Sequence, residues 1–569
     1  MKLTRVLIGW MLACALAAPA WAHHVVWLDF SEFDLSAFPS INGNSPPTAN
    51  DVEAVRQQVI ANMTEDYAPF DIYFTPFQPP NGRYTRVRIL RDGDGNPNKT
   101  YYGCAGGGCC RPGGTCGGNI RDDVVSSCEV YSASFAGFSA FRNANATTAR
   151  VANGISHTAS HELGHVLLLG HCHAADDAIT LGCTGITTTT NDQNTRWHIM
   201  ASGSSWKLTT EERASRDRFF SIHSSRRLLL STLQVRNHWN LLPNVNAGFG
   251  LADLAYGRVA SPQIMNWFVR TSTTSGTQFE NAKLWVNDAG NASDLFYIAD
   301  VTGDDRADLV YGRVLSATQV AWFVQRSLPG DTFGNVVIWR TDAGDAGDIF
   351  RLADVNGDGR DDLVYGRRLS ADVVRWYVRL STGNGFGNVS TWVSDAGGDG
   401  YLFLISDVDN DGDSDLVYGI PGSAWYVRRS NGSSFGSLET FWFSAGATGD
   451  LFFLPDLTGD GNADLVSARV NSDTAVQWSY HQPNPDAVAI VNLSNDAGDA
   501  GDIFRFGYAG GDGRVDLFYA RPLGMASLTA TPDLSLIRWY GRPSNSGVPG
   551  FGAVTTWRSD AGDEGDTFP

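Results

Sequence analysis

The C-terminal half of the chain repeats short apolar runs that are separated by polar turns. One period contains four strand-like runs, at residues 349–355, 363–367, 374–380 and 390–393. An Asp-rich turn lies between the first two runs, and its last aspartate recurs at positions 253, 308, 362, 415, 464 and 516. Successive copies are therefore 49 to 55 residues apart. Four strands in a period of this length predict the blades of a β-propeller. The copies predict six blades, or seven if residues 240–245 and 560–568 combine into another one.

The N-terminal half lacks this repeat and mixes strand and helix patterns. An apolar run at residues 23–30 predicts a first strand, and an apolar stripe predicts a helix over residues 51–63 that begins at Asn50 or Asp51. Further strands are expected at residues 71–75, 84–90, 124–130 and 136–141, and further helices at residues 156–169 and 208–222. We expect the strand at 136–141 to form a sheet edge along which an extended peptide can lie. This order of elements predicts an α/β (α+β) domain.

Length and charge limit the classes of protein to consider. A chain of 569 residues is too long for one hydrophobic core. The patterns divide it into a signal peptide at 1–22, an α/β domain at 23–223, a linker at 224–240 and an all-β propeller at 241–569. The formal net charge is -19, which argues against a nucleic-acid partner because no surface that could neutralise phosphates is evident. We expect no membrane span, since no long apolar segment follows residue 22.

The N-terminus and the cysteines both indicate export. Lys2 and Arg5 precede an apolar stretch, and Ala20-Trp21-Ala22 fits a signal-peptidase site. Cleavage near Ala22 would give a secreted protein, extracellular or periplasmic. Seven of the eight cysteines lie between Cys104 and Cys183. Such clustering predicts disulfides in an oxidising compartment, with one cysteine left over that is free, pairs between chains or binds something.

The helix expected at 156–169 contains the pattern His161-Glu162-x-x-His165. Residues four apart lie on one face of a helix, so His161 and His165 can point two imidazoles at one metal ion. Glu162 can then reach a water on that metal. His171 follows as a third ligand, with His173 as the alternative. Three histidines leave one tetrahedral position open, which is typical of a catalytic zinc site.

The Asp-rich turns of the repeats predict calcium binding. Four of them place oxygen-bearing side chains at positions 1, 3, 5 and 9 of a tight Gly-containing turn, an arrangement that suits Ca²⁺. The predicted ligands are Asp300, Thr302, Asp304, Asp308, Asp354, Asn356, Asp358, Asp362, Asp407, Asp409, Asp411, Asp415, Asp456, Thr458, Asp460 and Asp464. The alternative is that Asp-Gly pairs simply make turns. The copies that end at Asp253 and Asp516 lack most of the ligands.

Two family resemblances follow from these motifs. The pattern HExxHxxxxxH, followed 29 residues later by Met200 in an Ile-Met-Ala-Ser segment, resembles the metzincin metalloproteases over about residues 23–223. The resemblance implies zinc ligation by His161, His165 and His171, catalysis by Glu162, and a Met-turn at Met200 beneath the histidines. Leu168 stands where that family has a glycine. The repeats resemble FG-GAP/VCBS propeller repeats over about residues 240–569.

Together these patterns predict a secreted zinc-dependent endopeptidase that acts on a protein or peptide. Zinc would polarise the scissile carbonyl and activate a water, and Glu162 as general base would take the water's proton and deliver it to the leaving amine. By analogy, the calcium-binding propeller would bind a glycan or a surface protein. The alternative is a non-catalytic secreted adhesin or lectin that acts through the propeller. A third reading is a zinc hydrolase of something other than peptides.

Overall fold

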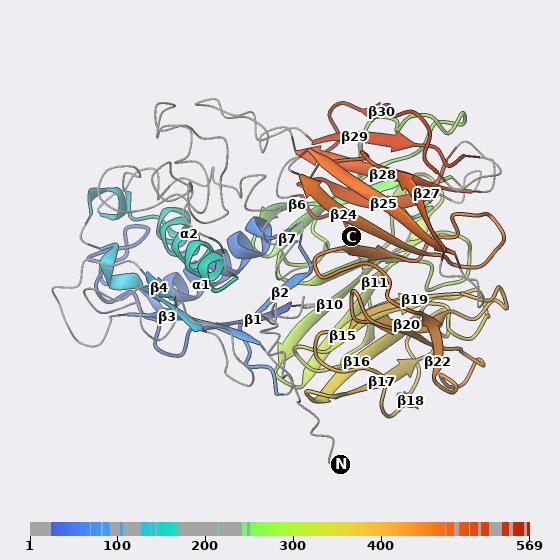
Figure 1. Ribbon diagram of the computed structural model, residues 1–569. Coiled ribbons are helices and arrows are strands. Elements are labelled where there is room, and N and C mark those ends of the chain that lie inside the picture. The colour runs from blue at the N-terminus through green and yellow to red at the C-terminus, as the bar shows by residue number, and fades with distance from the viewer. Residues whose placement is uncertain are drawn as a thin grey trace, which may run out of the picture.

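The structure is a computed structural model, and it describes residues 24–91, 103–105, 127–169, 214, 242–246 and 251–569, with shorter gaps inside these ranges. The predicted signal peptide and linker lie outside the described residues. So does most of the helix expected at 208–222. Figure 1 shows a sheet with two helices beside a ring of β-sheets. None of the described helices is long and apolar enough to cross a membrane.

The N-terminal part is a five-stranded sheet with the order β2-β1-β3-β5-β4. Its elements are β1 (His24–Asp29), α1 (Ala49–Asp66), β2 (Ile72–Thr75), β3 (Thr85–Leu90), β4 (Gly103–Ala105), β5 (Ser127–Tyr131), η1 (Ser132–Ser134), η2 (Ser139–Phe141) and α2 (Thr148–Val166). All neighbouring strands are parallel except β4, which runs antiparallel to β5. Four of the five predicted strands and two of the three predicted helices are present here.

Both helices begin earlier than the apolar pattern predicts. The N-cap of α1 is Thr48, not Asn50 or Asp51. The Thr48 hydroxyl oxygen accepts a hydrogen bond from the Asp51 backbone, and the Asp51 carboxylate accepts one from the Thr48 backbone, which makes a capping box. Helix α2 begins at Thr148 instead of residue 156, capped by Thr147. The first turns of α2 are small and polar, so hydrophobic periodicity alone does not reveal them.

The predicted edge strand at 136–141 is wrong. This segment forms the 3₁₀ turn η2, preceded by η1. Phe135 directly follows η1, and Phe141 is the last residue of η2. Phe135 and Phe141 are fully buried and pack edge to face with ring centroids 5.4 Å apart. The sheet edge beside β5 is instead formed by β4, in a Cys- and Gly-rich segment.

The C-terminal half forms six blades, five of four strands and one of three. Blade 1 contains β6 (Leu254–Ser261), β7 (Ile264–Arg270) and β8 (Lys283–Val286); blade 2 contains β9 (Leu295–Ala299), β10 (Asp308–Ser316), β11 (Gln319–Gln325) and β14 (Val337–Arg340), with the ribbon β12 (Ser327–Leu328) and β13 (Thr332–Phe333); blade 3 contains β15 (Ile349–Ala353), β16 (Asp362–Ser370), β17 (Val373–Arg379) and β18 (Ser390–Val393); blade 4 contains β19 (Leu402–Ser406), β20 (Asp415–Gly419), β21 (Trp425–Arg428) and β22 (Glu439–Trp442); blade 5 contains β23 (Leu451–Phe453), β24 (Leu465–Ser472), β25 (Ala475–Gln482) and β26 (Ala489–Ser494); blade 6 contains β27 (Ile503–Tyr508), β28 (Val515–Pro522), β29 (Ile537–Arg542) and β30 (Thr555–Arg558). The prediction of a six-bladed all-β propeller is confirmed.

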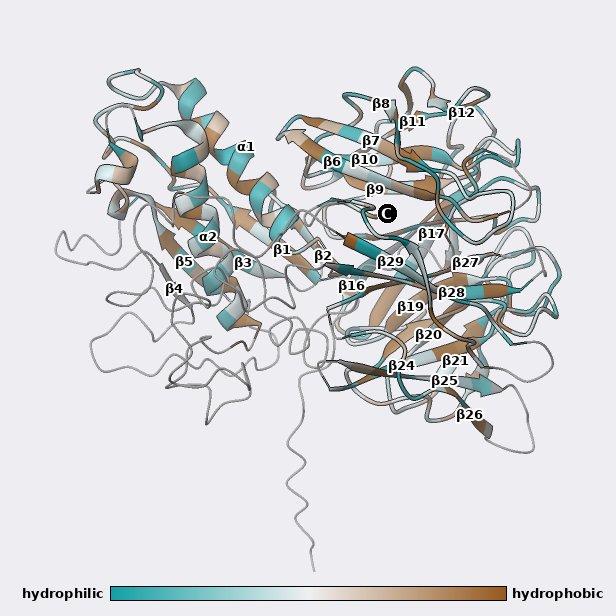
Figure 2. Cartoon of the chain, turned by 90° about the horizontal axis from the view of Figure 1, so that it is seen from above, coloured by the Kyte–Doolittle hydropathy of each residue, from teal (hydrophilic) through white to brown (hydrophobic). Residues whose placement is uncertain are grey.

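One tryptophan in each blade anchors the propeller core. The six lie on β7, β11, β17, β21, β25 and β29 and are fully buried: Trp267, Trp322, Trp376, Trp425, Trp478 and Trp539. The residue opposite each indole, on the strand that precedes it in the chain, is Gly or Ala. A Cβ on Gly366, for example, would lie 2.9 Å from the Trp376 ring, so the ring needs the space that a small residue leaves. Hydrophobic residues gather accordingly on the strands of both parts (Figure 2).

Residues 566–568 close the ring of six blades, so the alternative of seven blades is wrong. Thr567 and Gly257 of β6 exchange two backbone hydrogen bonds, of 2.7 and 2.8 Å. The Arg258 guanidinium donates to both oxygens of Asp566, at 2.9 and 2.8 Å. Phe568 is buried against Tyr256 of the same blade. Residues 566–568 therefore serve as the missing inner strand of blade 1.

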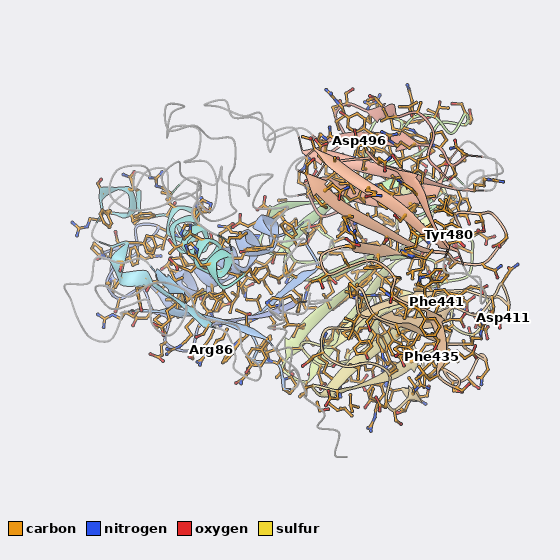
Figure 3. All side chains as sticks on the ribbon, viewed as in Figure 1. Arg86, Asp411, Phe435, Phe441, Tyr480 and Asp496 are labelled. Carbon is orange, nitrogen blue, oxygen red and sulfur yellow. The ribbon has the colours of Figure 1, made fainter. Side chains whose placement is uncertain are left out.

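The N-terminal sheet packs on one face of the propeller. Val25 and Tyr73 share a buried cluster with Leu295 and Tyr297, and a Cβ on Gly347 would lie 3.2 Å from Pro79. Gly347 lies in a connection between two blades. In an up-and-down blade these connections share one face with the hairpins between second and third strands, and the Asp-rich turns lie on the opposite face. Figure 3 places Asp411 on the side of the propeller away from the N-terminal sheet.

Candidate metal centre

Helix α2 brings His161 and His165 together on one face. Their Nε2 atoms lie 3.1 Å apart, and their rings are nearly perpendicular with centroids 4.7 Å apart. Zinc binds imidazole nitrogen at about 2.0–2.1 Å, so two tetrahedral ligands have nitrogens roughly 3.3 Å apart. The pair therefore fits one zinc ion, and it is half-buried, as a site open to substrate requires.

A second hydrogen bond sets the protonation of His165. Its Nδ1 lies 2.8 Å from the Leu169 carbonyl oxygen. A carbonyl only accepts, so Nδ1 carries the proton and Nε2 keeps its lone pair for a metal. Burial lowers the pKa of His165, which favours the neutral ring. The backbone just after α2 thus orients this imidazole as a ligand.

Glu162 lies beside the histidine pair and close to β5. Burial raises the pKa of the Cys128 thiol, and the nearby Glu162 carboxylate raises it further. Cys128 is a buried free thiol. The predicted partners His171, His173 and Met200, and the departure at Leu168, all lie outside the described residues. The described centre therefore contains two of the three predicted zinc ligands and the predicted base.

A buried polar network between α1 and α2 supports the turn that precedes His161. The Ser160 hydroxyl donates to Asp66 at 2.6 Å, and the Tyr67 hydroxyl donates to the Ser160 carbonyl at 2.9 Å. On α1, one turn before Asp66, the side-chain amide of Asn62 donates to the Asn153 side-chain oxygen at 2.9 Å. Sequence reasoning missed these residues. The available signal was the placement of Asn62 and Asp66 four residues apart, inside the buried face of α1.

The Asp-rich turns connect the first and second strands of blades 2 to 5. Carboxylate oxygens of Asp407, Asp409 and Asp415 all lie within 4.8 Å of one another. No other such acidic group was found among the described residues. The first aspartate of each turn also shapes its own backbone. Asp300, for example, accepts hydrogen bonds from the Gly303 and Asp305 amides, each at 2.7 Å.

Each of the four turns holds one predicted ligand oxygen that is buried and has no hydrogen-bond partner among the described residues. These atoms are Asp308 Oδ2, Asn356 Oδ1, Asp409 Oδ1 and Thr458 Oγ1. Burial also raises the pKa of Asp362 to about 8 and that of Asp415 to about 7, with neighbouring carboxylates adding to both shifts. A hard divalent cation would supply the missing partner and offset the cost of the buried carboxylates.

Comparisons with known proteins bear on the propeller. A family model described as an FG-GAP-like repeat matches residues 354–418 and 407–467. No curated protein matches the chain. The similar solved structures include an Agrocybe aegerita lectin described as recognising non-reducing terminal N-acetylglucosamine, with 18% identity over 55% of this chain and 81% of the lectin and a TM-score of 0.37.

Two further solved structures are similar over about the same share of the chain. AofleA from Arthrobotrys oligospora has 9% identity over 57% of this chain and 89% of that protein, with a TM-score of 0.31. A β-xylosidase/α-arabinofuranosidase from a compost microbial metagenome has 12% identity over 56% of this chain and 97% of that protein, with a TM-score of 0.24. At these TM-scores, none of the three identifies a ligand or an activity for this chain. The chain carries FG-GAP-like repeats in a six-bladed β-propeller.

Proposed function

We propose that the N-terminal part is a zinc-dependent hydrolase of peptide bonds, of metzincin type, in an exported protein. The observation that carries this proposal is the 3.1 Å separation of the His161 and His165 Nε2 atoms, with Glu162 beside them on the same helix. The hydrogen bond from His165 Nδ1 to Leu169 adds support, because it leaves Nε2 available to a metal. His171 remains the proposed third ligand.

Different residues of α2 would bind the metal and transfer the proton. His161 and His165 would hold the zinc ion, which when bound supplies a Lewis acid for a scissile carbonyl. Glu162 is positioned to accept a proton from an attacking water and to pass it to the leaving amine. The network from Asp66 and Tyr67 to Ser160 keeps this turn of α2 in place. A misplacement of about 1 Å would cost much of the rate, so rigid support matters here.

Metal removal tests the proposal. The purified full chain should contain one equivalent of zinc and should cleave members of a peptide library. We expect a chelator to abolish cleavage and added zinc to restore it, and His161→Ala to lose both metal and activity. A chain that binds no zinc, or that cleaves peptides equally well after chelation, would contradict the proposal. Activity on ester or amide probes alone would point to a non-peptide substrate.

The second candidate function is non-catalytic, a secreted protein that binds a glycan or surface protein through its propeller. The match to the FG-GAP-like repeat favours this candidate, and the comparisons support it better than they support the peptidase. The two candidates differ in what the Glu162 carboxylate does. Binding through the propeller would persist in a variant without it, whereas hydrolysis would not.

Calcium is the cofactor that we propose for the Asp-rich turns. We expect saturating Ca²⁺ to raise the melting temperature of the propeller, since a ligand at a hundredfold excess over its Kd stabilises a protein by about 2.7 kcal/mol. Asp409→Ser should reduce this shift by removing one ligand. The control is Asp305→Asn, at a turn position that is not a predicted ligand. The melting temperatures are measured by differential scanning calorimetry. If calcium raises the melting temperature of the wild type and of Asp409→Ser by the same amount, the result counts against the site.

A further inference from the structure

Five blades carry a buried serine two residues after the strand that holds the core tryptophan. In each of these blades the serine amide donates to the last aspartate of the blade's own turn, at 2.6 to 2.8 Å. The pairs are Ser272–Asp253, Ser327–Asp308, Ser381–Asp362, Ser430–Asp415 and Ser544–Asp516. In blade 5 the equivalent position lies outside the described residues. In blades 2 to 4 the serine therefore fixes a predicted calcium ligand.

The serine hydroxyls differ in the blade that they reach. In blades 1, 2 and 6 the hydroxyl donates to a carbonyl of its own blade, which belongs to Ala252, Ala307 or Val515. In blade 3 the Ser381 hydroxyl donates instead to the Val301 carbonyl of blade 2, at 2.6 Å. In blade 4 the Ser430 hydroxyl donates to the Val355 carbonyl of blade 3, also at 2.6 Å. Two serines thus join the turns of neighbouring blades.

Both accepting carbonyls lie inside predicted calcium turns. Val301 and Val355 each occupy position 2 of a turn, between the predicted ligands at positions 1 and 3. The two bridges therefore occur where both neighbouring turns carry the predicted ligands. In the described blades whose serine makes no bridge, at least one of the two neighbouring turns is that of blade 1 or blade 6, which lacks most ligands. The bridge accompanies the calcium ligands.

The bridges and the turns form one chain of hydrogen bonds. The Asp362 carboxylate, held by the Ser381 amide, also accepts a hydrogen bond from the Val355 amide, at 3.3 Å. The Val355 carbonyl accepts from Ser430, whose amide donates to Asp415 at 2.7 Å. All five residues are buried, so water competes little for these hydrogen bonds. The chain runs from the turn of blade 2 through that of blade 3 to a predicted ligand of blade 4.

The turns also contact one another through their backbones. The Asp361 amide of blade 3 donates to the Asp300 carbonyl of blade 2 at 2.7 Å, and the Ser414 amide of blade 4 donates to the Asp354 carbonyl of blade 3 at 2.8 Å. Burial raises the pKa of Asp361, and the charges of Asp300 and Asp354 raise it further. The Asp361 carboxylate therefore lies close to the acidic turns of two blades. A cation in either turn would reduce the repulsion that both turns feel.

We propose that the turns of blades 2, 3 and 4 bind Ca²⁺ as one coupled unit, in which an ion in one turn raises the affinity of the neighbouring turn. Binding fixes the backbone of a turn, and with it the carbonyl at position 2. The serine that donates to this carbonyl is then fixed too, and its amide holds a ligand of the next turn. The first ion thus reduces the ordering that the second site requires. This inference rests on calcium, proposed above as the cofactor of these turns.

Coupling changes how the propeller would respond to calcium. Independent sites fill gradually as the calcium concentration rises, whereas coupled sites fill over a narrower range. Blades 2, 3 and 4 would therefore become rigid together. Residues outside the ligand set, Ser381 and Ser430, would set the sharpness of this response.

The test removes the two bridging hydroxyls from the full-length chain. Wild type and Ser381→Ala/Ser430→Ala are titrated with Ca²⁺ in competition with a chromophoric chelator, and bound calcium is counted by atomic emission. We expect the wild type to bind with a Hill coefficient above about 1. The double variant should bind as many ions, because the amides that hold Asp362 and Asp415 remain. Its Hill coefficient should fall to about 1, and its half-saturating calcium concentration should rise about fivefold or more.

The matched control is Ser272→Ala/Ser327→Ala. It removes two hydroxyls at the equivalent position, but these hydroxyls donate within their own blades, so its Hill coefficient should equal that of the wild type. Melting temperatures in a calcium chelator show that each variant is folded. A second variant, Asp361→Ala, introduces the residue that blades 2 and 5 have at this position. It should raise the calcium-free melting temperature and lower the Hill coefficient, and it decides the test if the serine variant does not fold.

Three results would overturn the inference. Calcium binding by the wild type with a Hill coefficient of about 1 would show that the turns are independent, and calcium would remain their cofactor. Equal Hill coefficients in the wild type and in the folded variant that decides the test would show that these contacts carry no coupling. A wild type that binds no calcium would contradict the proposed cofactor itself, and the coupling with it.

Discussion

Replacing Glu162 by glutamine is expected to lower the rate of peptide hydrolysis by about a hundred- to ten-thousandfold, the contribution typical of a general base. The amide keeps the size of the side chain but cannot take a proton from water. Because Glu162 is not a proposed zinc ligand, the variant should retain its metal. The measurement is kcat/KM on a peptide identified from a library, together with zinc content.

The matched control is Glu53→Gln. Glu53 lies exposed on α1, and its partners among the described residues are Arg56 and Gln57 of the same helix, so its loss should leave hydrolysis unchanged. Hydrolysis that persists in Glu162→Gln with zinc still bound would show that another group acts as the base. A variant that loses zinc as well as activity would instead place Glu162 among the groups that hold the metal.

Deleting residues 566–569 is expected to destabilise the propeller strongly. The deletion removes the Thr567 backbone pairing to β6, the Asp566 partner of Arg258 and the buried Phe568 ring. The single change Phe568→Ala should already lower the free energy of unfolding by about 3–5 kcal/mol, as expected for a buried phenylalanine. Thermal and urea unfolding of the full-length chain and the variants measure the effect.

Phe443→Ala provides the comparison for this loss. Phe443 is 63% exposed on blade 4, so its truncation should change stability by less than about 0.5 kcal/mol. A deletion variant that unfolds at the wild-type temperature would show that the ring does not depend on residues 566–569. In that case residues 242–246, which also pack against blade 6, would have to close it.

The propeller could be predicted from the sequence because each blade repeats the same local choices. The four strand-like runs of the third period correspond to β15, β16, β17 and β18 within a few residues. The pairing of Thr567 with Gly257 could not be predicted in this way. It joins residues 310 positions apart. The run AGDEGDTF at residues 561–568 repeats the AGDAGDIF that leads into β15, which marks an inner strand, but this local pattern does not say which blade the strand completes. That is why a seventh blade remained open.

The candidate metal centre likewise has local features that the sequence predicted and long-range contacts that it could not predict. The spacing of His161 and His165 predicted that the two rings would meet, because helical geometry is local. The supports of the centre are long-range: Ser160 meets Asp66 and Tyr67 across two helices, and His165 is fixed by a backbone carbonyl rather than by a side chain. Any residue can offer a backbone carbonyl, so the sequence does not reveal such a hydrogen bond.

The closure of blade 1 by residues 566–568 has a consequence for the time course of folding. Strand β6 cannot obtain its inner partner until some 310 further residues exist, which at about 5–20 residues per second takes roughly 15–60 s of synthesis. During that interval β6 presents an unpaired edge, the kind of surface that invites aggregation. Such distant pairing also slows folding itself. We therefore expect the propeller to depend on chaperones that hold the chain until the final residues are available.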